Sequence, residues 1–201
     1  MPGDYQSFTV NEPKIDIEGP NMGIEYDGDR GEEARIEGQI TIKANNVSIN
    51  GLYMDAEGFD EAVNFADVSY ININNNIFKN AQTRGFSADV DHLTVRSNMF
   101  YSTGEAGIDN IGSDNQITIK ENKFEGISPG AGIVLGSDVN DNYVSLEDNK
   151  FKNNYWHLQS DTVFEKEEDL YPDNIMENNI FPGDEKVVYD QEPEWVILDE
   201  N

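Results

Sequence analysis

Two carboxylates near the middle of the chain have the residue types that acid–base chemistry on a sugar requires. Glu105 and Asp109 are four residues apart. A pair of carboxylates can cleave a glycosidic bond when one acts as general acid and the other as base or nucleophile. The chain holds 40 acidic residues among its 201, so such pairs arise freely by chance. A solvated acidic surface is the favoured interpretation, and catalysis at Glu105 and Asp109 is the alternative.

A second set of carboxylates recurs at regular intervals. Each member follows a small or polar residue, and successive members are 22, 25, 24 and 23 residues apart. The series consists of Asp67, Asp89, Asp114, Asp138 and Asp161. If these residues lie above one another, like charges repeat at about 5 Å and repel. We favour a role in which each carboxylate bonds backbone amides at a turn. The alternative is a ladder of Na⁺, K⁺ or Ca²⁺ ions, and no other cofactor is expected.

Aromatic side chains on a strand flank are candidates for stacking on a sugar ring. We predict Tyr101, Tyr155 and His157 as ligand-binding residues. Alignment of the two Leu-x-Ser-Asp segments in the C-terminal half places Trp156 at the inward position of Ile133 and turns Tyr155 and His157 outward. Closing the last turn of the fold is the commoner role for such a stretch.

The charge balance excludes several classes of partner. The 40 acidic and 13 basic residues give a formal net charge of −27. Nucleic acid is excluded because phosphate binding needs clustered Lys and Arg, and an anionic membrane surface is disfavoured for the same reason. The acidic residues are dispersed from Asp4 to Glu200. We interpret them as a surface that stays hydrated in concentrated salt and repels itself at low ionic strength; an acidic mesophilic protein is the alternative.

Other features of composition narrow the class of protein further. The chain has no cysteine and two histidines, which excludes disulfide scaffolds, Cys-based metal sites and a multi-histidine site within one chain. No apolar run is long enough to span a membrane. The start, Met-Pro-Gly-Asp-Tyr, is not a signal peptide. We therefore expect either that the protein is not secreted by that route or that a leader lies outside this sequence.

A repeat organises most of the chain and must position these candidates. The unit reads apolar-x-apolar-x-x-Asn-x-aromatic, as in residues 71–78, Ile-Asn-Ile-Asn-Asn-Asn-Ile-Phe. From Gly51, which holds the asparagine position in an earlier relative, the anchors are separated by 25, 22, 24, 27 and 30 residues. The anchors are Gly51, Asn76, Asn98, Asn122, Asn149 and Asn179. This motif and the Asp series share a period of about 24 residues, which is hard to obtain by chance.

The period and its content predict an all-β solenoid. Segments such as Ile-Thr-Ile at 117–119 alternate apolar and polar residues, as half-buried strands do. Strands of this length, separated by Asn, Asp and Gly, fit a three-sided parallel β-helix of about six to seven coils with about 24 residues each. Leucine-rich repeats lack their consensus here, a propeller needs longer blades, and a sandwich would not keep two motifs in phase.

In such a coil, residues one period apart lie over one another in columns. We expect the asparagine column to take the left-handed conformation at a corner and to bond its neighbours' side chains. The predicted inward columns are Ile71, Leu93, Ile117 and Val144; Ile73, Val95, Ile119 and Leu146; and Phe78, Phe100, Phe124, Phe151 and Phe181.

The motif also carries a resemblance to a known superfamily. The pattern Gly-Ile-x-Leu-x-x-Ser-x-x-Asn-x-Ile-x-Ile-x-x-Asn-x-Phe, at 107–124 and 132–151, resembles the repeat of pectate-lyase-like proteins, NosD-like surface proteins and many viral tailspikes. The opening Pro-Gly-Asp-Tyr at 2–5 resembles their first coil. The resemblance covers residues 2–182 and implies a right-handed parallel β-helix. It is weak for function, since this scaffold hosts lyases, hydrolases, adhesins and inert fibres.

The superfamily also suggests how an active site would be built. Its lyases use Asp or Glu to hold Ca²⁺ and an Arg or Lys as base, and its hydrolases use two or three close Asp residues. On that pattern Arg84 or Arg96 could approach Glu105 and Asp109 from the preceding turn, although none of the four recurs as a recognisable signature. The copper connection of NosD-like proteins has no support in two histidines and no cysteine.

The two ends of the coil raise a separate expectation. Residues 1–182 are predicted to form the β-helix and 183–201 a C-terminal cap or assembly tail, whose apolar patches lie at 187–189 and 195–198. Superfamily members usually carry a capping segment before Pro-Gly-x-Tyr, and here Met1 stands directly before it. Because an open end shows unpaired strand edges, we expect a missing segment, another subunit or a larger assembly to cover it.

Together these features favour a non-catalytic structural or receptor-binding module on a virion or cell exterior in a halophilic setting. We expect it to form a homo-oligomer or dock onto another structural protein, and to contact glycans or an S-layer. The alternative is a polysaccharide lyase or glycoside hydrolase acting on an acidic polysaccharide. Neither nucleic-acid binding nor membrane insertion is expected.

Overall fold

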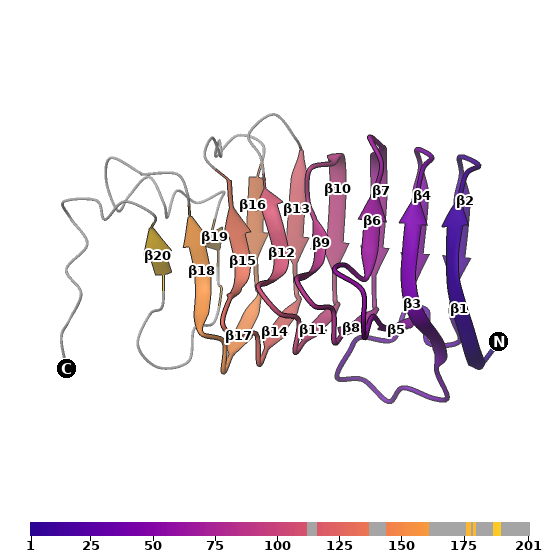
Figure 1. Cartoon of the computed structure of the whole chain (residues 1–201), viewed down its shortest axis with the longest axis horizontal. Helices are drawn as coiled ribbons and strands as arrows, with labels where there is room; N and C mark the ends of the chain where they lie inside the picture. The colour runs from indigo at the N-terminus through magenta and orange to yellow at the C-terminus, as the bar shows by residue number, and fades with distance from the viewer. Residues whose placement is uncertain (112–115, 137–143, 161–175, 178, 180–186, 190–201) are drawn as a thin grey trace.

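The chain folds into a rod of stacked parallel strands, with the N-terminus at one end (Figure 1). The computed structural model describes residues 1–111, 116–136, 144–160, 176–177, 179 and 187–189. Every strand pair in this part of the chain is parallel, and strands far apart in sequence lie side by side because each coil pairs with the next.

The strands form three sheets, named here A, B and C. Sheet A is ordered β1 (Gly3–Val10), β3 (Ala34–Ile42), β5 (Tyr53–Asp55), β8 (Ile77–Lys79), β11 (Met99–Tyr101), β14 (Lys123–Glu125) and β17 (Lys150–Lys152), with β6 (Val63–Phe65) paired to β3. Sheet B is ordered β2 (Ile15–Glu18), β4 (Val47–Asn50), β7 (Ser69–Asn74), β10 (Asp91–Arg96), β13 (Ile117–Lys120), β16 (Val144–Glu147) and β19 (Met176–Glu177). Sheet C is ordered β9 (Arg84–Ser87), β12 (Ala106–Ile111), β15 (Ala131–Leu135), β18 (Trp156–Ser160) and β20 (Val187–Tyr189).

The predicted coil is confirmed in its architecture. From β5 onward five turns place separate strands on three sides, from β5–β6–β7 to β17–β18–β19. The two N-terminal turns each use one long strand, β1 or β3, and one short strand. The second half of β3 pairs with β6 while its first half pairs with β5, so one strand there covers two sides. Six to seven coils are reached only when these two turns are counted.

A buried ladder of asparagine amides runs along the corner between sheets B and A. Asn76 Nδ2 donates to Asn98 Oδ1 at 3.1 Å, and Asn98 Nδ2 donates to Asn122 Oδ1 at 3.0 Å. The ladder continues from Asn122 to Asn149 at 3.1 Å and from Asn149 to Asn179 at 3.0 Å. Each amide also donates to a carbonyl of the preceding coil, such as Asn98 to Ile73 at 2.8 Å. The predicted bonding between neighbouring asparagines is confirmed.

The predicted left-handed backbone belongs to a different residue. The positive φ falls on the residue directly before four of the ladder asparagines: Asn75 at 55°, Ser97 at 54°, Glu121 at 58° and Asp148 at 52°. The prediction for the asparagines themselves was wrong. Each asparagine points its side chain into the rod while its backbone leads into the next strand, so it cannot also make the turn. The tight turn is therefore made one position earlier.

The phenylalanines stack in single file inside the rod. Successive rings of Phe78, Phe100, Phe124 and Phe151 lie 4.6, 4.9 and 5.1 Å apart and within 13° of parallel. Glycines on sheet C make room for this column: a Cβ on Gly107 would lie 2.6 Å from Phe124 Cδ1. The aromatic column is confirmed for these four, and Phe181 lies outside the described residues.

The aliphatic columns of sheet B are also confirmed. Ile71, Leu93, Ile117 and Val144 are paired in register, as are Ile73, Val95, Ile119 and Leu146. These eight side chains are at most 1% exposed. Since burying one such side chain contributes about 1.5–3 kcal/mol, each coil adds a similar increment to a continuous narrow core.

The first coil leaves inward-facing side chains open. Tyr5 is 41% exposed and Ile15 is 37% exposed, whereas their register partners Ile36 and Val47 are 3% and 0% exposed. No strand in the described residues pairs with the outer edge of β1 or β2. The N-terminal end of the rod therefore presents apolar side chains and unpaired main-chain groups.

We expect Asn98→Ala to destabilise the protein by about 3 kcal/mol or more, because it leaves buried groups without partners. The backbone N–H and amide of Asn76 would lose their acceptor, and the carbonyl of Ile73 would lose a donor. Urea denaturation measures the change. Asn64→Ala is the control, since this half-buried asparagine bonds Glu61 on the surface, and it should cost about 1 kcal/mol or less. Equal losses would contradict a special role for the ladder.

Candidate functional site

Arg84 lies between two carboxylates contributed by neighbouring coils. Its Nη1 forms an ion pair with Asp109 Oδ2 in the coil above, and its Nε lies 3.2 Å from Glu61 Oε1 in the coil below. The side chains of Arg84 and Asp109 are 27% and 26% exposed, and that of Glu61 is 15% exposed. The structure therefore brings together two of the four predicted catalytic candidates, with Glu61 as an addition.

A β-bulge aims the Asp109 carboxylate. Between Ile108 and Ile111, β12 has one more residue than its partner β15, whose pairing residues are Ile133 and Leu135. Asn110 accommodates the extra residue with a φ of 56°. Its backbone N–H donates to Asp109 Oδ1 at 2.8 Å. Bulges re-aim side chains at functional sites, and this one leaves Asp109 with one oxygen on Arg84 and the other on the main chain.

The other two catalytic candidates lie apart from this group. Glu105 is exposed before β12, and among the described residues its carboxylate forms no hydrogen bond or ion pair. Arg96 ends β10 and donates from Nε to Glu121 Oε2 at 2.8 Å. Glu105 and Asp109 as an acid–base pair therefore stay a prediction, with Asp109 held by Arg84 and by the main chain. An arginine stays protonated at all ordinary pH values, so the ion-paired Arg84 is poorly suited to act as a base.

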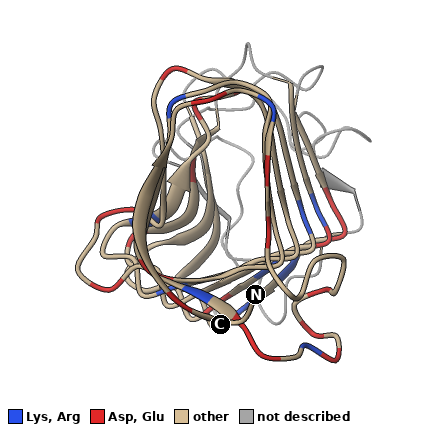
Figure 2. Ribbon diagram, turned by 90° about the vertical axis from the view of Figure 1, so that its right-hand side faces the viewer, with Lys and Arg blue, Asp and Glu red and all other residues tan. Residues whose placement is uncertain are grey.

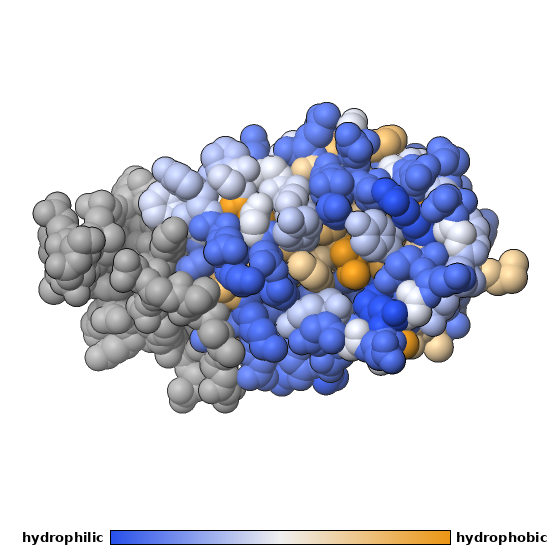
Figure 3. Space-filling view, turned by 90° about the horizontal axis from the view of Figure 1, so that it is seen from below, coloured by the Kyte–Doolittle hydropathy of each residue, from blue (hydrophilic) through white to orange (hydrophobic). Residues whose placement is uncertain are grey.

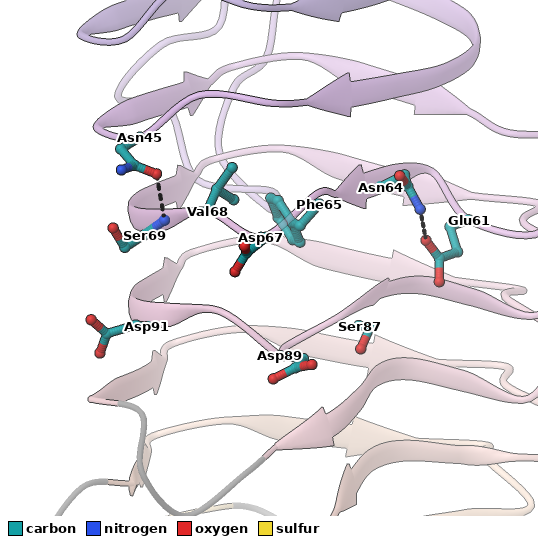
Figure 4. Close-up of a pocket in the computed structure, with 10 residues that line it drawn as sticks. All are labelled: Asn45, Glu61, Asn64, Phe65, Asp67, Val68, Ser69, Ser87, Asp89 and Asp91. Carbon is teal, nitrogen blue, oxygen red and sulfur yellow. Dashed lines mark hydrogen bonds between the residues drawn. The ribbon is translucent and has the colours of Figure 1, made fainter.

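A polar hollow of about 560 Å³ lies at the corner between sheets C and B, next to this group (Figure 4). Its walls are dominated by carboxylates, amides and hydroxyls. They come from Glu61, Asp67, Asp89, Asp91, Asn45, Asn64, Ser69 and Ser87, with Phe65 and Val68 as the apolar part. The hollow is thus acidic, and its side chains are dispersed over several coils.

The Asp series is represented here by Asp67 and Asp89, which lie on adjacent coils and are exposed (Figure 4). In the described part of the chain neither carboxylate accepts a hydrogen bond, so the predicted bonding to corner amides is wrong for these two. Asp67 itself makes the turn, with a φ of 49°, which leaves its side chain toward solvent. Within the same residues no cluster of three or more His, Asp or Glu is placed to hold a metal. Asp114, Asp138 and Asp161 lie outside the described residues.

The three predicted sugar-binding residues occupy different settings. Tyr101 is 38% exposed on β11, with Lys79 Nζ 5.6 Å from its ring centre. Tyr155 is 53% exposed, and its ring packs edge-on against Trp156 at 4.9 Å. His157 is 2% exposed, with its ring 5.9 Å from that of Phe151.

The predicted orientation of the Trp156 segment was wrong for Trp156 and His157, whereas Tyr155 is exposed as predicted. β18 pairs with β15 so that Leu158 lies over Ile133 and Trp156 over Ala131. His157 therefore continues the column of Gly132 and turns inward, while Trp156 is half-buried. The alignment on Leu-x-Ser-Asp failed because the connection from β17 to β18, residues 153–155, is two residues shorter than the one from β14 to β15, residues 126–130.

Several glutamates are held by the few basic residues. The Arg96 guanidinium, through its hydrogen bonds, keeps the pKa of Glu121 below its usual value. Lys123 and Lys152 flank Glu125 and lower its pKa, and Lys120 and Ser145 do so for Glu147. Along the rod, acidic residues line the perimeter, many in loops and at corners (Figure 2). The face seen from below is mostly hydrophilic (Figure 3). The described residues contain no helix that could cross a membrane.

Sequence reasoning missed one further surface feature. The rings of Tyr70 and His92 lie 4.3 Å apart on the outer side of sheet B, beside Asn72, Thr94 and Thr118. Outward positions carry no periodic apolar signal, so the repeat did not single them out. One sequence signal could have identified this pair. Tyr70 directly precedes the segment Ile-Asn-Ile, and His92 directly precedes the equivalent segment Leu-Thr-Val one coil later.

The three parallel sheets, the internal amide ladder and the aromatic file define a parallel β-helix protein. The family model described as "Right handed beta helix region" matches residues 16–124, and the chain belongs to that family. No curated protein and no solved structure is significantly similar to the chain. A β-helix domain of this family fits a surface or carbohydrate-related role.

We expect no new sugar ends when the protein is incubated with acidic polysaccharides such as polygalacturonate, because both oxygens of Asp109 are engaged. Reducing-end and unsaturation assays measure turnover. Asp109→Asn and Glu105→Gln are the matched variants. Activity that is lost in either variant would contradict the expectation and establish a polysaccharide-active enzyme.

Proposed function

We propose that the protein is a non-catalytic structural or receptor-binding module on the exterior of a virion or cell in a salt-rich setting. It forms oligomers or docks onto another structural protein, and it contacts glycans or an S-layer. The observation that carries this proposal is the open first coil. Its inward side chains are exposed, whereas the same columns are buried one coil further on.

Unpaired strand edges of this kind are templates for pairing with another chain. The edge of β1 offers main-chain donors and acceptors over eight residues. Tyr5 and Ile15 add apolar surface that association would bury. Any segment that pairs with this edge would continue the rod, and a neighbouring copy or another structural protein is the partner that the proposal names.

The surface supports a salt-rich setting. The chain has a net charge of −27, and the acidic residues of its described part are spread over the perimeter (Figure 2). Such a surface repels itself at low ionic strength, and at about 3 M salt the screening length falls to a few ångströms or less. A narrow core with a dispersed acidic surface thus gains stability from salt.

The polysaccharide-active enzyme remains the second candidate, on the strength of Arg84 and its two carboxylates. An arginine engaged on both sides serves better as a bridge between coils, because it joins Glu61 and Asp109 across three turns. We therefore assign this group to stabilising sheet C.

In about 3 M KCl we expect the protein to elute from a sizing column as an oligomer, and Ile15→Lys to elute as a smaller species. A charge on the open edge disfavours strand pairing, and an exposed position tolerates lysine in the folded monomer. Tyr101→Lys, at an exposed position far from the end, is the control and should elute like the unaltered protein. A monomeric unaltered protein would overturn self-association and leave docking onto another structural protein as the remaining form of the proposal.

The melting temperature should rise strongly between about 0.1 M and about 3 M KCl, because screening removes repulsion among surface carboxylates. Differential scanning calorimetry measures it. Sucrose at matched water activity is the control, since it strengthens burial without screening charge. A flat KCl series would remove the halophilic part of the proposal and leave the fold unaffected.

A further inference from the structure

The outer face of sheet B carries a ladder of uncharged hydrogen-bonding side chains. On each strand the residue between two buried aliphatic side chains points outward, and these residues pair in register from coil to coil. The ladder consists of Ser48, Asn72, Thr94, Thr118 and Ser145. Neighbouring rungs are about 4.8 Å apart along the rod. Each side chain can both donate and accept.

Two aromatic rings stand beside this ladder, at the corner where sheet B begins. Tyr70 and His92 stack with their planes 31° apart, and Tyr70 is 49% exposed. Asp91 Oδ1 lies 2.8 Å from His92 Nδ1. The pair and the ladder line one hollow of about 270 Å³, formed by Tyr70, Asn72, His92, Thr94, Gln116 and Thr118.

Turn formation alone does not account for Tyr70. Its φ is 58°, in the left-handed region, and that of His92 is 57°. Asn46 occupies the same corner one coil earlier with a φ of 59°. Asparagine tolerates this conformation well, while a bulky side chain is strained there. The corner would therefore be less strained with asparagine, and the turn itself does not require the exposed ring of Tyr70.

We propose that this hollow binds a neutral glycan whose chain runs along the rod axis. This proposal rests on the proposed function and names the ligand class and the site. Sugar rings present apolar C–H faces that stack on aromatic side chains, and their hydroxyls match groups that donate and accept. The rung spacing is close to the length of one pyranose unit, so successive units meet successive rungs.

The composition of the lining favours a neutral chain. None of the six lining residues is acidic or carries Lys or Arg, while the protein as a whole has a net charge of −27. An acidic polysaccharide would find no Lys or Arg side chain in the lining of the hollow. This separates the site from Tyr101, which lies beside Lys79 on another face.

Glucan, mannan and galactan oligosaccharides, with polygalacturonate as the acidic probe, test the site by calorimetry in about 3 M KCl. We expect at least one neutral glycan to bind and polygalacturonate not to bind. Tyr70→Asn, which copies the corner at Asn46, should weaken affinity about tenfold without lowering the melting temperature. Thr94→Val, which keeps the shape and removes the hydroxyl, should weaken it by about the same factor.

Matched controls separate the site from the rest of the surface. Thr41→Val removes an outward hydroxyl from β3, and Tyr101→Asn removes an exposed ring from sheet A; both should bind like the unaltered protein. Binding that survives in Tyr70→Asn and Thr94→Val, or that is lost in Tyr101→Asn, would overturn the site and leave glycan contact in place. Preference for polygalacturonate, or no binding of any probe by an oligomer, would overturn the neutral-glycan inference alone. Release of sugar ends would instead refute the proposed non-catalytic function.

Discussion

The rest of the structure depends on the amide ladder between sheets B and A. Asn98 shows the pattern. Its side-chain oxygen accepts from the backbone N–H and the side-chain amide of Asn76 one coil earlier, and its own amide donates to the side-chain oxygen of Asn122 one coil later. All of these groups are buried, so an unmade bond costs about 1–3 kcal/mol. A coil shifted by one residue would break several at once. The ladder thereby fixes the register that lets Phe100 and Phe124 stack and the aliphatic columns close.

A fixed register also decides how chemistry can be arranged on the outside. Since side chains alternate across a strand, every inward column implies an outward column with the same spacing. Surface groups therefore come in straight rows, which suit a linear ligand or a neighbouring rod. A catalytic site needs groups that converge on one point. In the described chain the clearest departure from straight rows is the bulge at Asp109. The carboxylate that this bulge redirects forms an ion pair with Arg84.

The fold could be predicted because its interior is periodic, and the site could not because its exterior is not. Burial requires an apolar residue at the positions equivalent to Ile71 and Ile73 in each coil. The amide ladder requires asparagine at the positions equivalent to Asn76. These residue types therefore recur visibly in the sequence. Tyr70 and His92 face outward, where no packing rule repeats a residue type. The inverted orientation of His157 arose because the segments between strands vary in length, and an alignment on their polar residues carries no information about register.

Charged side chains are distributed differently over the corners and the flat faces of the rod. Basic residues such as Arg96 and Lys120 lie at strand ends, where they pair with Glu121 and Glu147. In the described part of the chain many carboxylates lie in loops and at corners (Figure 2), where they stay hydrated. The middle of sheet B is left uncharged from Ser48 to Ser145. An acidic protein can in this way keep one neutral hydrogen-bonding face, and a neutral ligand on that face does not have to enter the field of the carboxylates at close range.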